Sequence, residues 1–323
     1  MSVDEFLAEW HNDSPTVLVH TSGSTGTPKP LLVEKRRMEA SARITCDFLG
    51  LKAGDSALLC MSLDYIAGKM MVVRSLVGGL RLTVVEPCGH PLQMLTAPID
   101  FAAMVPMQVY NSLQVAEERR RLMAVRHLII GGGAVDDALA SELRHFPNAV
   151  WSTYGMTETL SHIALRRLSG SDASEWYTPF AGVKLSLTDA DHCLVINAPS
   201  VHDGMLVTND IAMLAPNGRF RILGRKDNVI CSGGIKIQIE EVERLLRPHL
   251  HIPYLISKRH DEKFGELVVL LTEGEVTAAR EVCEHVLPKY WQPRVYIHVT
   301  RIPLTATGKP ARCQAEILAQ PSL

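Results

Sequence analysis

The sequence has no closely spaced cysteines and no histidine pair with the spacing of a helical zinc site. Its seven cysteines lie far apart without a Cys-x-x-Cys pair, and its 13 histidines never take the His-x-x-x-His spacing. Without such pairs, neither a disulfide framework nor a zinc site is expected. Dispersed cysteines favour reduced thiols, so we expect a cytoplasmic protein.

Long hydrophobic runs and an excess of one charge are also missing. No apolar run reaches the roughly 18 residues that a membrane-spanning helix needs, and the opening MSVDEFLAEW has no basic region followed by an apolar core. We therefore expect neither a secretory signal nor a membrane partner. Because the formal net charge is only −2, nucleic acid is not expected as a partner either, and an acidic ligand must be bound by local groups.

The 323 residues, 46% of them hydrophobic, are enough to bury a sizeable core and to form two domains. Apolar strands are predicted at 16–19, 57–61, 81–85, 127–130 and 149–153, and helices at 35–49 and 136–146. This alternation predicts an α/β fold with an open, largely parallel sheet. Such sheets bind ligands at the carboxyl ends of their strands.

The pattern changes in the second half of the chain. Short strands separated by Asn, Gly and Pro turns at 181–223 predict a small β subdomain, and a new helix-and-strand unit follows. We place the domain boundary near Asp227. The prediction is a large α/β domain with a small β subdomain at 1–226 and an α+β lid domain at 227–323.

The stretch HTSGSTGTPKP (20–30) combines glycines, hydroxyls and a lysine in one short turn. It is not a Walker A loop, because Lys29 follows a proline and the flanking apolar segments predict a hairpin-like turn. Its glycines permit close backbone approach, so its amides and hydroxyls can surround an oxyanion while Lys29 adds a cation. Taken alone, it also fits a plain surface turn. The candidate phosphate-binding residues are Thr21, Ser22, Gly23, Ser24, Thr25, Gly26 and Lys29.

Five further motifs follow in order: GGGA (131–134), YGMTET (154–159), TND (208–210), GRKDNVICSGG (224–234) and PLTATGKPAR (303–312). With the first loop, they make the chain resemble the adenylate-forming superfamily of acyl-CoA synthetases, adenylation domains and luciferases over nearly its whole length. YGMTETLSHIA and NVICSGGIKIQIEEVE look like the o-succinylbenzoate–CoA ligase branch of menaquinone biosynthesis. The resemblance implies ATP, Mg²⁺ and CoA, with an acyl-AMP made first and a thioester second.

The resemblance gives each motif a nucleotide-binding role. Tyr154 would stack on adenine, although a core tyrosine is the alternative, and Asp210 and Arg225 would hold the ribose. Glu158 would bind Mg²⁺ together with Thr21, since Mg²⁺ on ATP uses one or two protein carboxylates, and Thr157 would donate to a phosphate. The remaining residues implied to contact the nucleotide are Gly131, Gly132, Gly133, Ala134, Gly155 and Met156.

The apolar segment YIAGKMMVVRSLVGG predicts a helix that carries Arg74. Burying a guanidinium is costly unless it is paired. Its partner is either Asp64 or Glu86 within the fold or a second carboxylate on the substrate, and the resemblance favours the substrate. Ser161 and His162 are candidates for the same acid pocket, and as plain residues they would start a helix.

The end of the chain supplies the parts of the second domain. Lys309, in a turn set by glycine and prolines, is the predicted catalytic cation that bridges the carboxylate and the α-phosphate. The resemblance makes Asp227 a hinge and assigns a pantetheine passage to Ser232, Gly233 and Gly234, which otherwise form an ordinary turn.

The sequence also departs from the family it resembles. Relatives carry a substantial N-terminal subdomain before the phosphate loop, and here it is nearly absent, so we expect a minimal enzyme that can form a homodimer. Pro30 replaces a usual glycine, and Asp64-Tyr65 precedes the substrate helix where an aromatic residue or histidine is common. Three other functions stay open: a ligase for another aryl or dicarboxylic acid, an adenylation enzyme that loads a carrier protein, and a silent nucleotide-binding subunit.

Overall fold

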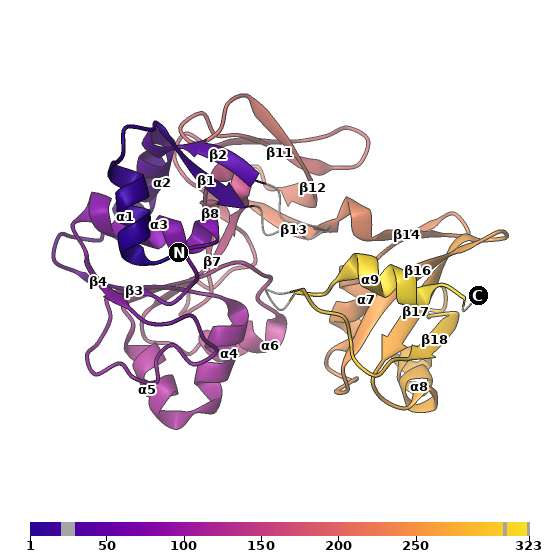
Figure 1. The fold of residues 1–323 in the computed structure, drawn as a ribbon. Helices are drawn as coiled ribbons and strands as arrows, with labels where there is room; N and C mark the ends of the chain where they lie inside the picture. Colours follow the sequence, from indigo (N-terminus) through magenta and orange to yellow (C-terminus); the bar gives the residue numbers. More distant parts are fainter. Residues whose placement is uncertain (21–29, 306–308, 322–323) are drawn as a thin grey trace.

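The computed structural model describes residues 1–20, 30–305 and 309–321, which form two lobes (Figure 1). The N-terminal lobe runs from helix α1 (Val3–His11) to strand β13 (Phe220–Arg225), and the C-terminal lobe from β14 (Val229–Ser232) to α9 (Arg312–Ala319). The short 3₁₀ helix η2 (Lys226–Asn228) joins them. In the described residues, no helix is long and apolar enough to cross a bilayer.

A seven-stranded sheet in the order β4-β3-β5-β6-β7-β8-β9 forms the centre of the N-terminal lobe. Its five parallel strands are β4 (Arg81–Val84), β3 (Ser56–Leu59), β5 (Phe101–Met104), β6 (His127–Ile130) and β7 (Ala149–Gly155). Two antiparallel strands, β8 (His162–Arg167) and β9 (Thr178–Pro179), complete it. The prediction of an α/β fold with a largely parallel sheet is confirmed.

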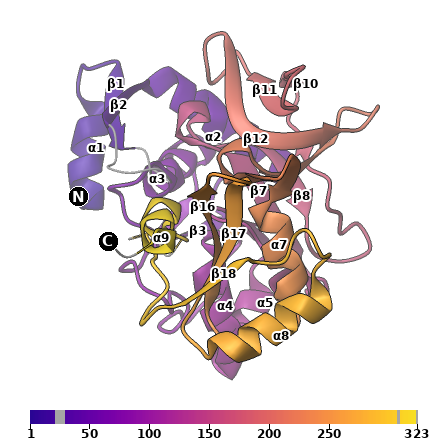
Figure 2. The same cartoon turned by 90° about the vertical axis from the view of Figure 1, so that its right-hand side faces the viewer.

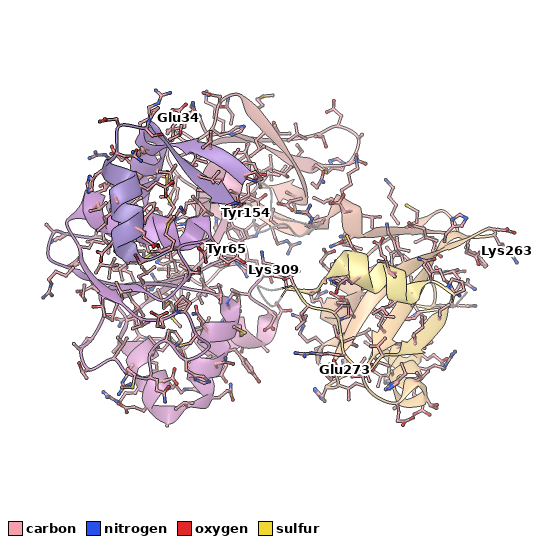
Figure 3. All side chains as sticks on the ribbon, in the orientation of Figure 1. Glu34, Tyr65, Tyr154, Lys263, Glu273 and Lys309 are labelled. Atoms are coloured by element: carbon pink, nitrogen blue, oxygen red, sulfur yellow. The ribbon has the colours of Figure 1, made fainter. Side chains whose placement is uncertain are left out.

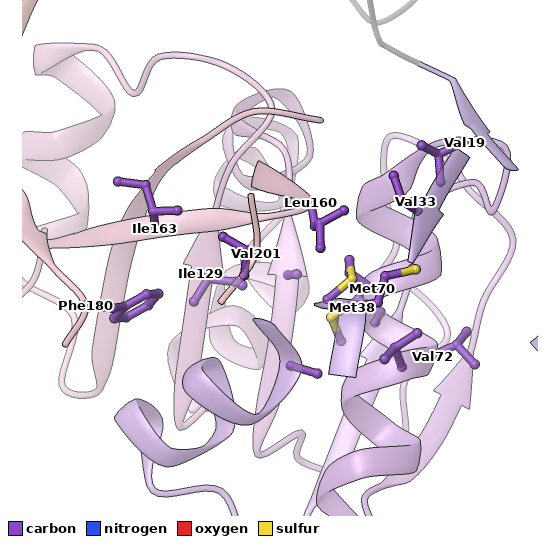
Figure 4. Close-up of a cluster of buried hydrophobic side chains, with 14 of the residues drawn as sticks. Val19, Val33, Met38, Met70, Val72, Ile129, Leu160, Ile163, Phe180 and Val201 are labelled. Atoms are coloured by element: carbon purple, nitrogen blue, oxygen red, sulfur yellow. The ribbon is translucent and has the colours of Figure 1, made fainter. Parts of the chain in front are cut away.

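Helices cover both faces of this sheet because its strand residues alternate between two buried cores. Leu59 and Ile129 pack toward α2 (Lys35–Leu49) and α3 (Ile66–Gly78), whereas Leu58 and Ile130 pack toward the opposite helices. Figure 4 shows the first of these cores, which includes Met38 of α2, Met70 of α3, Ile163 of β8 and Leu160, which precedes that strand. The opposite helices are α4 (Pro106–Gln114), α5 (Ala116–Ala124) and α6 (Asp137–Leu143).

The predicted hairpin near the start of the chain is present. Strand β1 (Thr16–His20) pairs antiparallel with β2 (Pro30–Glu34), and His20 lies opposite Pro30. His20 also bridges to Tyr65, which immediately precedes α3. The two ends of the candidate phosphate loop are therefore held beside the helix that carries Arg74.

The small β subdomain is a separate four-stranded antiparallel sheet. It contains β10 (Lys184–Leu187), β11 (Cys193–Asn197), β12 (Met205–Leu214) and β13. Asp210 was expected after an apolar strand, but β12 continues through it, with irregular register toward β11 between Val207 and Ile211 and toward β13 after Ile211. Pairing with β13 holds the strand extended, so Asp210 faces Arg225 across the ladder.

The C-terminal lobe is a five-stranded sheet between helices on both sides (Figure 2). Ile256 and Leu270 pack toward α7 (Ile239–Leu246) and α8 (Val276–Val286), and Leu255 and Leu271 pack toward α9. Its strands are β14, β15 (Ile235–Gln238), β16 (Tyr254–Asp261), β17 (Gly265–Thr272) and β18 (Val295–His298).

Polar contacts join the two lobes. Gln238 Nε2 donates to the Arg225 carbonyl oxygen at 2.9 Å, and Arg247 lies 3.8 Å from the carboxylate of Asp136, the residue that caps α6. The C-terminal lobe thus contacts both the small β subdomain and the helix that follows the GGGA loop.

Candidate functional site

The predicted nucleotide residues of the GGGA and YGMTET motifs lie at the carboxyl edge of the large sheet, where β6 and β7 end. Gly131 follows β6, and a Cβ atom there would lie 2.5 Å from Thr153 Oγ1 of β7, so the two chain segments approach too closely for a side chain. Gly132 has a φ of +77°, which favours glycine. The GGGA loop is therefore held against the strand that carries Tyr154.

Gly155, the last residue of β7, brings a second segment to this edge. A Cβ atom there would lie 2.2 Å from the carbonyl oxygen of Ser161, and Gly155 pairs with His162 of β8. The Ser161–His162 backbone therefore packs directly on the end of β7, the strand that carries Tyr154. Sequence reasoning took Ser161 and His162, if not functional, as a helix start; this was wrong, because pairing with β7 makes the segment a strand.

Glu158 lies in a short 3₁₀ turn, η1 (Thr157–Thr159), between β7 and β8. The hydroxyl of Thr159 holds this turn by accepting from the Met156 amide at 3.0 Å, and His202 Nδ1 lies 3.1 Å from the Glu158 carbonyl oxygen. The Glu158 side chain is exposed, and its carboxylate has no hydrogen bond or ion pair to the rest of the described chain. Such a free carboxylate on a fixed turn fits a Mg²⁺ ligand.

Asp210 connects the predicted adenine and ribose residues. The hydroxyl of Tyr154 donates to Asp210 Oδ2 at 2.7 Å, and Arg225 Nη1 lies 3.3 Å from Asp210 Oδ1. Burial, together with the Asp210 carboxylate, raises the pKa of Tyr154, so the phenol stays protonated and acts as a donor. The three side chains that sequence analysis assigned to one nucleoside are in direct contact.

The ring of Tyr154 belongs to an aromatic cluster. It makes an edge contact with Phe220 at a centroid distance of 5.1 Å and lies 5.8 Å from the Tyr177 ring. These are the contacts of the core tyrosine that the sequence left as the alternative. Stacking on adenine stays a prediction.

Arg225 also contacts the predicted hinge. Its Nη2 donates to Asp227 Oδ2 at 2.9 Å, and Asn209 Nδ2 lies 3.2 Å from the same carboxylate oxygen. Burial alone would lower the pKa of Arg225, but Asp227 and Asp210 outweigh it and raise that pKa. The guanidinium is therefore charged and shared between Asp210, the candidate ribose-binding residue, and Asp227 at the junction of the lobes.

Lys309 reaches this site from the C-terminal lobe (Figure 3). Its backbone amide donates to Thr305 Oγ1 at 3.1 Å, which fixes the base of the loop. Burial, and secondarily the charge of Arg225, lowers the pKa of the Lys309 ammonium. A partly desolvated cation beside a second cation is electrostatically suited to an anionic ligand.

Ser232, Gly233 and Gly234 form the turn between β14 and β15. Both glycines have positive φ, +57° and +84°, and the Gly233 amide donates to the Phe264 carbonyl oxygen at 2.8 Å. A hairpin turn explains these glycines by itself, so their role in a pantetheine passage stays a prediction.

Arg74 is buried in α3, with 2% of its surface exposed. It donates from Nη2 to Ser161 Oγ, and its Nη1 lies 3.9 Å from the sulfur of Met71. No carboxylate of the described chain pairs with it, Nε has no partner there, and the residues outside the described ranges include no Asp or Glu. Burial lowers the Arg74 pKa to about 10, which still leaves the guanidinium charged at neutral pH.

Neither internal partner weighed from the sequence pairs with Arg74. Asp64 contacts the amino terminus at 3.4 Å and accepts from Ser62 Oγ at 2.8 Å, and Glu86 is exposed. The guanidinium is left with uncompensated charge beside the acid-pocket candidates Ser161 and His162.

Part of the predicted site lies outside the described residues. Thr21 to Gly26 and Lys29 fall outside the described residues, and so does the proposed contribution of Thr21 to the metal. Two surface hollows of about 240 and 320 Å³ lie along the α5 region and contain none of the predicted site residues in their lining.

Comparison with known proteins supports the reading of the motifs. Residues 4–208, more than half of the chain, match the family described as AMP-binding enzyme. The chain belongs to this family. An acyl-CoA synthetase (AMP-forming)/AMP-acid ligase II-like protein from Dyadobacter fermentans is 32% identical, with a TM-score of 0.66; the match covers 96% of this chain and 92% of that one.

Two further members of the family have more specific names. The 2-succinylbenzoate–CoA ligase of Salmonella typhimurium is 28% identical over 312 residues, covering 90% of this chain and 66% of the relative. An o-succinylbenzoate CoA synthetase from Bacillus subtilis, solved with its acyl-adenylate intermediate, matches with a TM-score of 0.77 at 24% identity; the match covers 92% of this chain and 68% of that one and shows the shared fold. The chain spans about two thirds of the length of such curated relatives, 66% and 65% for the first two.

Two residues that contact the candidate site residues were not predicted from the sequence. Asn209 is next to Asp210 in the TND motif, and its amide contacts the Asp227 carboxylate. Thr45 lies on the buried face of α2 and contacts the His162 ring at 3.2 Å. Polar residues on a largely apolar helix face, here Ser41 and Thr45 beside Ala42 and Cys46, are a signal that could have pointed to Thr45.

Proposed function

We propose that this member of the AMP-binding family is an acid–CoA ligase that uses ATP and Mg²⁺. It activates a carboxylic acid as an acyl-AMP and then transfers the acyl group to the thiol of CoA. The support is the contact of Tyr154 and Arg225 with Asp210, the exposed carboxylate of Glu158 after β7, and the effect of the Arg225 charge on Lys309, in a chain whose relatives carry the names of AMP-forming ligases.

In the first step, the substrate carboxylate attacks the α-phosphate of ATP and pyrophosphate leaves. Asp210 and Arg225 would orient the ribose, and Glu158 would hold Mg²⁺, which screens the phosphate charge when bound. Lys309 would stabilise the negative charge that accumulates where the carboxylate and the α-phosphate meet. Its desolvated ammonium favours that anionic pair over water.

The acid is proposed to be an aromatic dicarboxylate such as o-succinylbenzoate. The single observation that carries this proposal is the buried guanidinium of Arg74 without a carboxylate partner in the described chain. A fold does not bury an uncompensated charge without cost, and a second substrate carboxylate would compensate it. The names of the succinylbenzoate ligases among the relatives point to the same acid.

For the second step, we propose that residues 227–323 act as a lid that rotates about Asp227. Lys309 would leave the acyl-AMP, and the turn at Ser232–Gly234 would admit the pantetheine arm of CoA. The support is the position of Asp227 in the short η2 segment, where polar contacts rather than a shared hydrophobic core join the lobes.

The test is ATP–pyrophosphate exchange against a panel of mono- and dicarboxylic acids, followed by detection of the CoA thioester. We expect exchange with o-succinylbenzoate and a thioester when CoA is added. Exchange without a thioester would instead indicate an enzyme that loads a carrier protein. Absence of exchange with every acid would indicate a silent nucleotide-binding subunit.

A further inference from the structure

Arg74 begins a chain of hydrogen bonds that ends in the interior of the fold. Arg74 Nη2 donates to Ser161 Oγ, Ser161 Oγ lies 3.1 Å from His162 Nδ1, and His162 Nε2 lies 3.2 Å from Thr45 Oγ1. Thr45 in turn donates to the carbonyl oxygen of Ser41, one helical turn earlier, at 3.1 Å. The residues come from α3, β8 and α2.

The two ends of this chain, taken together with a neutral imidazole, give the direction of every bond in it. A guanidinium can only donate, and a carbonyl oxygen can only accept. Thr45 gives its one hydroxyl hydrogen to Ser41, so its oxygen must accept from His162 Nε2–H. His162 Nδ1 is then unprotonated and accepts from Ser161, whose oxygen lone pairs are left to Arg74.

The neutral imidazole in this chain leaves the guanidinium charge uncompensated. A carboxylate in place of the imidazole would also accept from Ser161, but its negative charge would compensate the charge of Arg74 inside the protein. Burial, reinforced by the nearby Arg74 charge, lowers the pKa of His162 well below its usual value, so the ring is neutral. Its contact with Thr45, which donates to Ser41, then favours the Nε2–H tautomer.

We propose that His162 is a specificity-determining positioning residue: through Ser161 it holds Arg74 in one orientation with its charge available to a second substrate carboxylate. Thr45 fixes the tautomer that makes this possible. The inference rests on the proposed dicarboxylate function and assigns to His162 an indirect role, because its two ring nitrogens are both occupied by protein hydroxyls.

The test compares two acids that differ only in the carboxylate that Arg74 would bind. They are o-succinylbenzoate and 4-oxo-4-phenylbutanoate, which lacks the ring carboxylate. The measured quantity is the ratio of their kcat/KM values in pyrophosphate exchange. For the wild type we expect a ratio of about 10² or more, since truncating one partner of a buried charge pair has effects of this order.

His162→Phe keeps an aromatic ring but removes both hydrogen bonds. We expect it to lower the ratio about tenfold, chiefly by raising KM for o-succinylbenzoate, because the lost interaction is remote from the reacting carboxylate. Thr45→Val, which keeps the shape of the side chain, should lower the ratio several-fold. Thr45→Ser, which keeps the hydroxyl, should retain it within about twofold.

The outcomes separate this inference from the proposed function. A wild-type ratio near one rejects the dicarboxylate substrate and with it the role of His162. A high wild-type ratio that both His162→Phe and Thr45→Val retain, with unchanged thermal melting, rejects the positioning role alone.

A measurement without substrate covers the case in which His162→Phe fails to fold. In ¹⁵N-histidine-labelled protein at pH 7, the ring signals of Thr45→Ser and Thr45→Val are compared. The signal that differs between the two variants is assigned to His162, and it should be that of a neutral Nε2–H tautomer. An Nδ1–H tautomer or a doubly protonated ring would overturn the proposal.

Discussion

Arg225 donates to the carboxylate of Asp227 across 2.9 Å. The other terminal nitrogen of the same guanidinium lies 3.3 Å from Asp210, the candidate ribose-binding residue. A movement of the lobes about Asp227 therefore changes the surroundings of a residue that also contacts the nucleotide site. This shared cation gives the proposed lid a physical link to the state of the nucleotide.

The proposed hinge can be tested with Asp227→Pro. Proline fixes φ near −65°, so rotation about this residue should be hindered. We expect CoA attack on a supplied acyl-adenylate to slow more than adenylation does, measured as two single-turnover half-reactions. Asp227→Ala is the matched control, because it also loses the Arg225 contact but leaves φ free. Equal slowing of the CoA step by both variants would refute the hinge.

Lys309→Ala should separate the two steps in the opposite way. Removing a preorganised charge-stabilising group costs about 10²-fold or more in rate, so adenylation should fall by this order while CoA attack on supplied acyl-adenylate barely changes. Rapid-quench measurement of each half-reaction gives both numbers. Lys289→Ala, an exposed lysine of the same lobe, controls for loss of charge. Equal loss of both steps in Lys309→Ala would exclude a lysine that leaves the site.

Glu158→Gln should weaken the use of Mg·ATP without destabilising the fold, because the carboxylate is exposed and has no partner in the described chain. We expect a sharp rise in the Mg²⁺ concentration needed for half-maximal exchange. Isothermal titration with ATP and Mg²⁺ measures the binding directly. Glu281→Gln, on the surface of α8, should change neither quantity. Unchanged nucleotide affinity and turnover in Glu158→Gln would remove this residue from the site.

Arg74→Ala should cost about 2–5 kcal/mol in kcat/KM toward o-succinylbenzoate, the range for truncating a buried charge pair. The monocarboxylate 4-oxo-4-phenylbutanoate should already react poorly with the wild type and should lose little more. Arg74→Lys keeps a charge but not the planar fork of donors, so its kcat/KM should lie between those of the wild type and Arg74→Ala. If monocarboxylates react with the wild type as well as dicarboxylates, Arg74 is a structural residue.

The buried His162 predicts a specific pH dependence of stability. Its pKa is lowered in the folded state, so below the unfolded value of about 6.5 the unfolded chain binds a proton that the folded chain does not. Its contribution to the free energy of unfolding is therefore full above this pH. It should decrease by about 1.4 kcal/mol per pH unit below it, until the folded pKa is reached.

The measurement is urea unfolding between pH 5 and pH 8. The slope of stability against pH should be smaller in His162→Phe than in the wild type by about this amount. His260→Phe, an exposed ring on β16, should keep the wild-type slope. Identical slopes in the wild type and His162→Phe would show that His162 is not held neutral in the folded state.

The sequence predicted those helices and strands whose local residue pattern matches the way they are buried in the fold. Helix 35–49 was predicted with its end at Gly50, and the structure places that glycine at φ +65° after Leu49. The carboxyl edge of the parallel sheet follows from strand–turn–helix order alone, so Gly131 and Tyr154 were predictable as neighbours.

What the sequence did not predict depends on pairing between distant segments. His162 was weighed as a helix start because its local pattern does not reveal that β7 is its neighbour. The contact between Thr45 and His162 joins residues 117 positions apart, so no local pattern contains it. The missing carboxylate partner of Arg74 also emerges only when the positions of all described acidic side chains are known.

The pairing of Gly155 with His162 has a consequence for changing which acid this chain accepts. One strand pair carries the candidate nucleotide residue Tyr154 on β7 and the candidate acid-binding residue His162 on β8, and the backbones approach too closely at Gly155 for a side chain to fit between them. Substitutions on β8 should therefore impair the reaction with ATP as well as change which acid is accepted. Residues on α2 and α3, such as Thr45 and Met71, reach the pocket from its other side. Redesign toward a different acid should begin on those two helices, where the shape of the pocket can change while the nucleotide edge keeps its register.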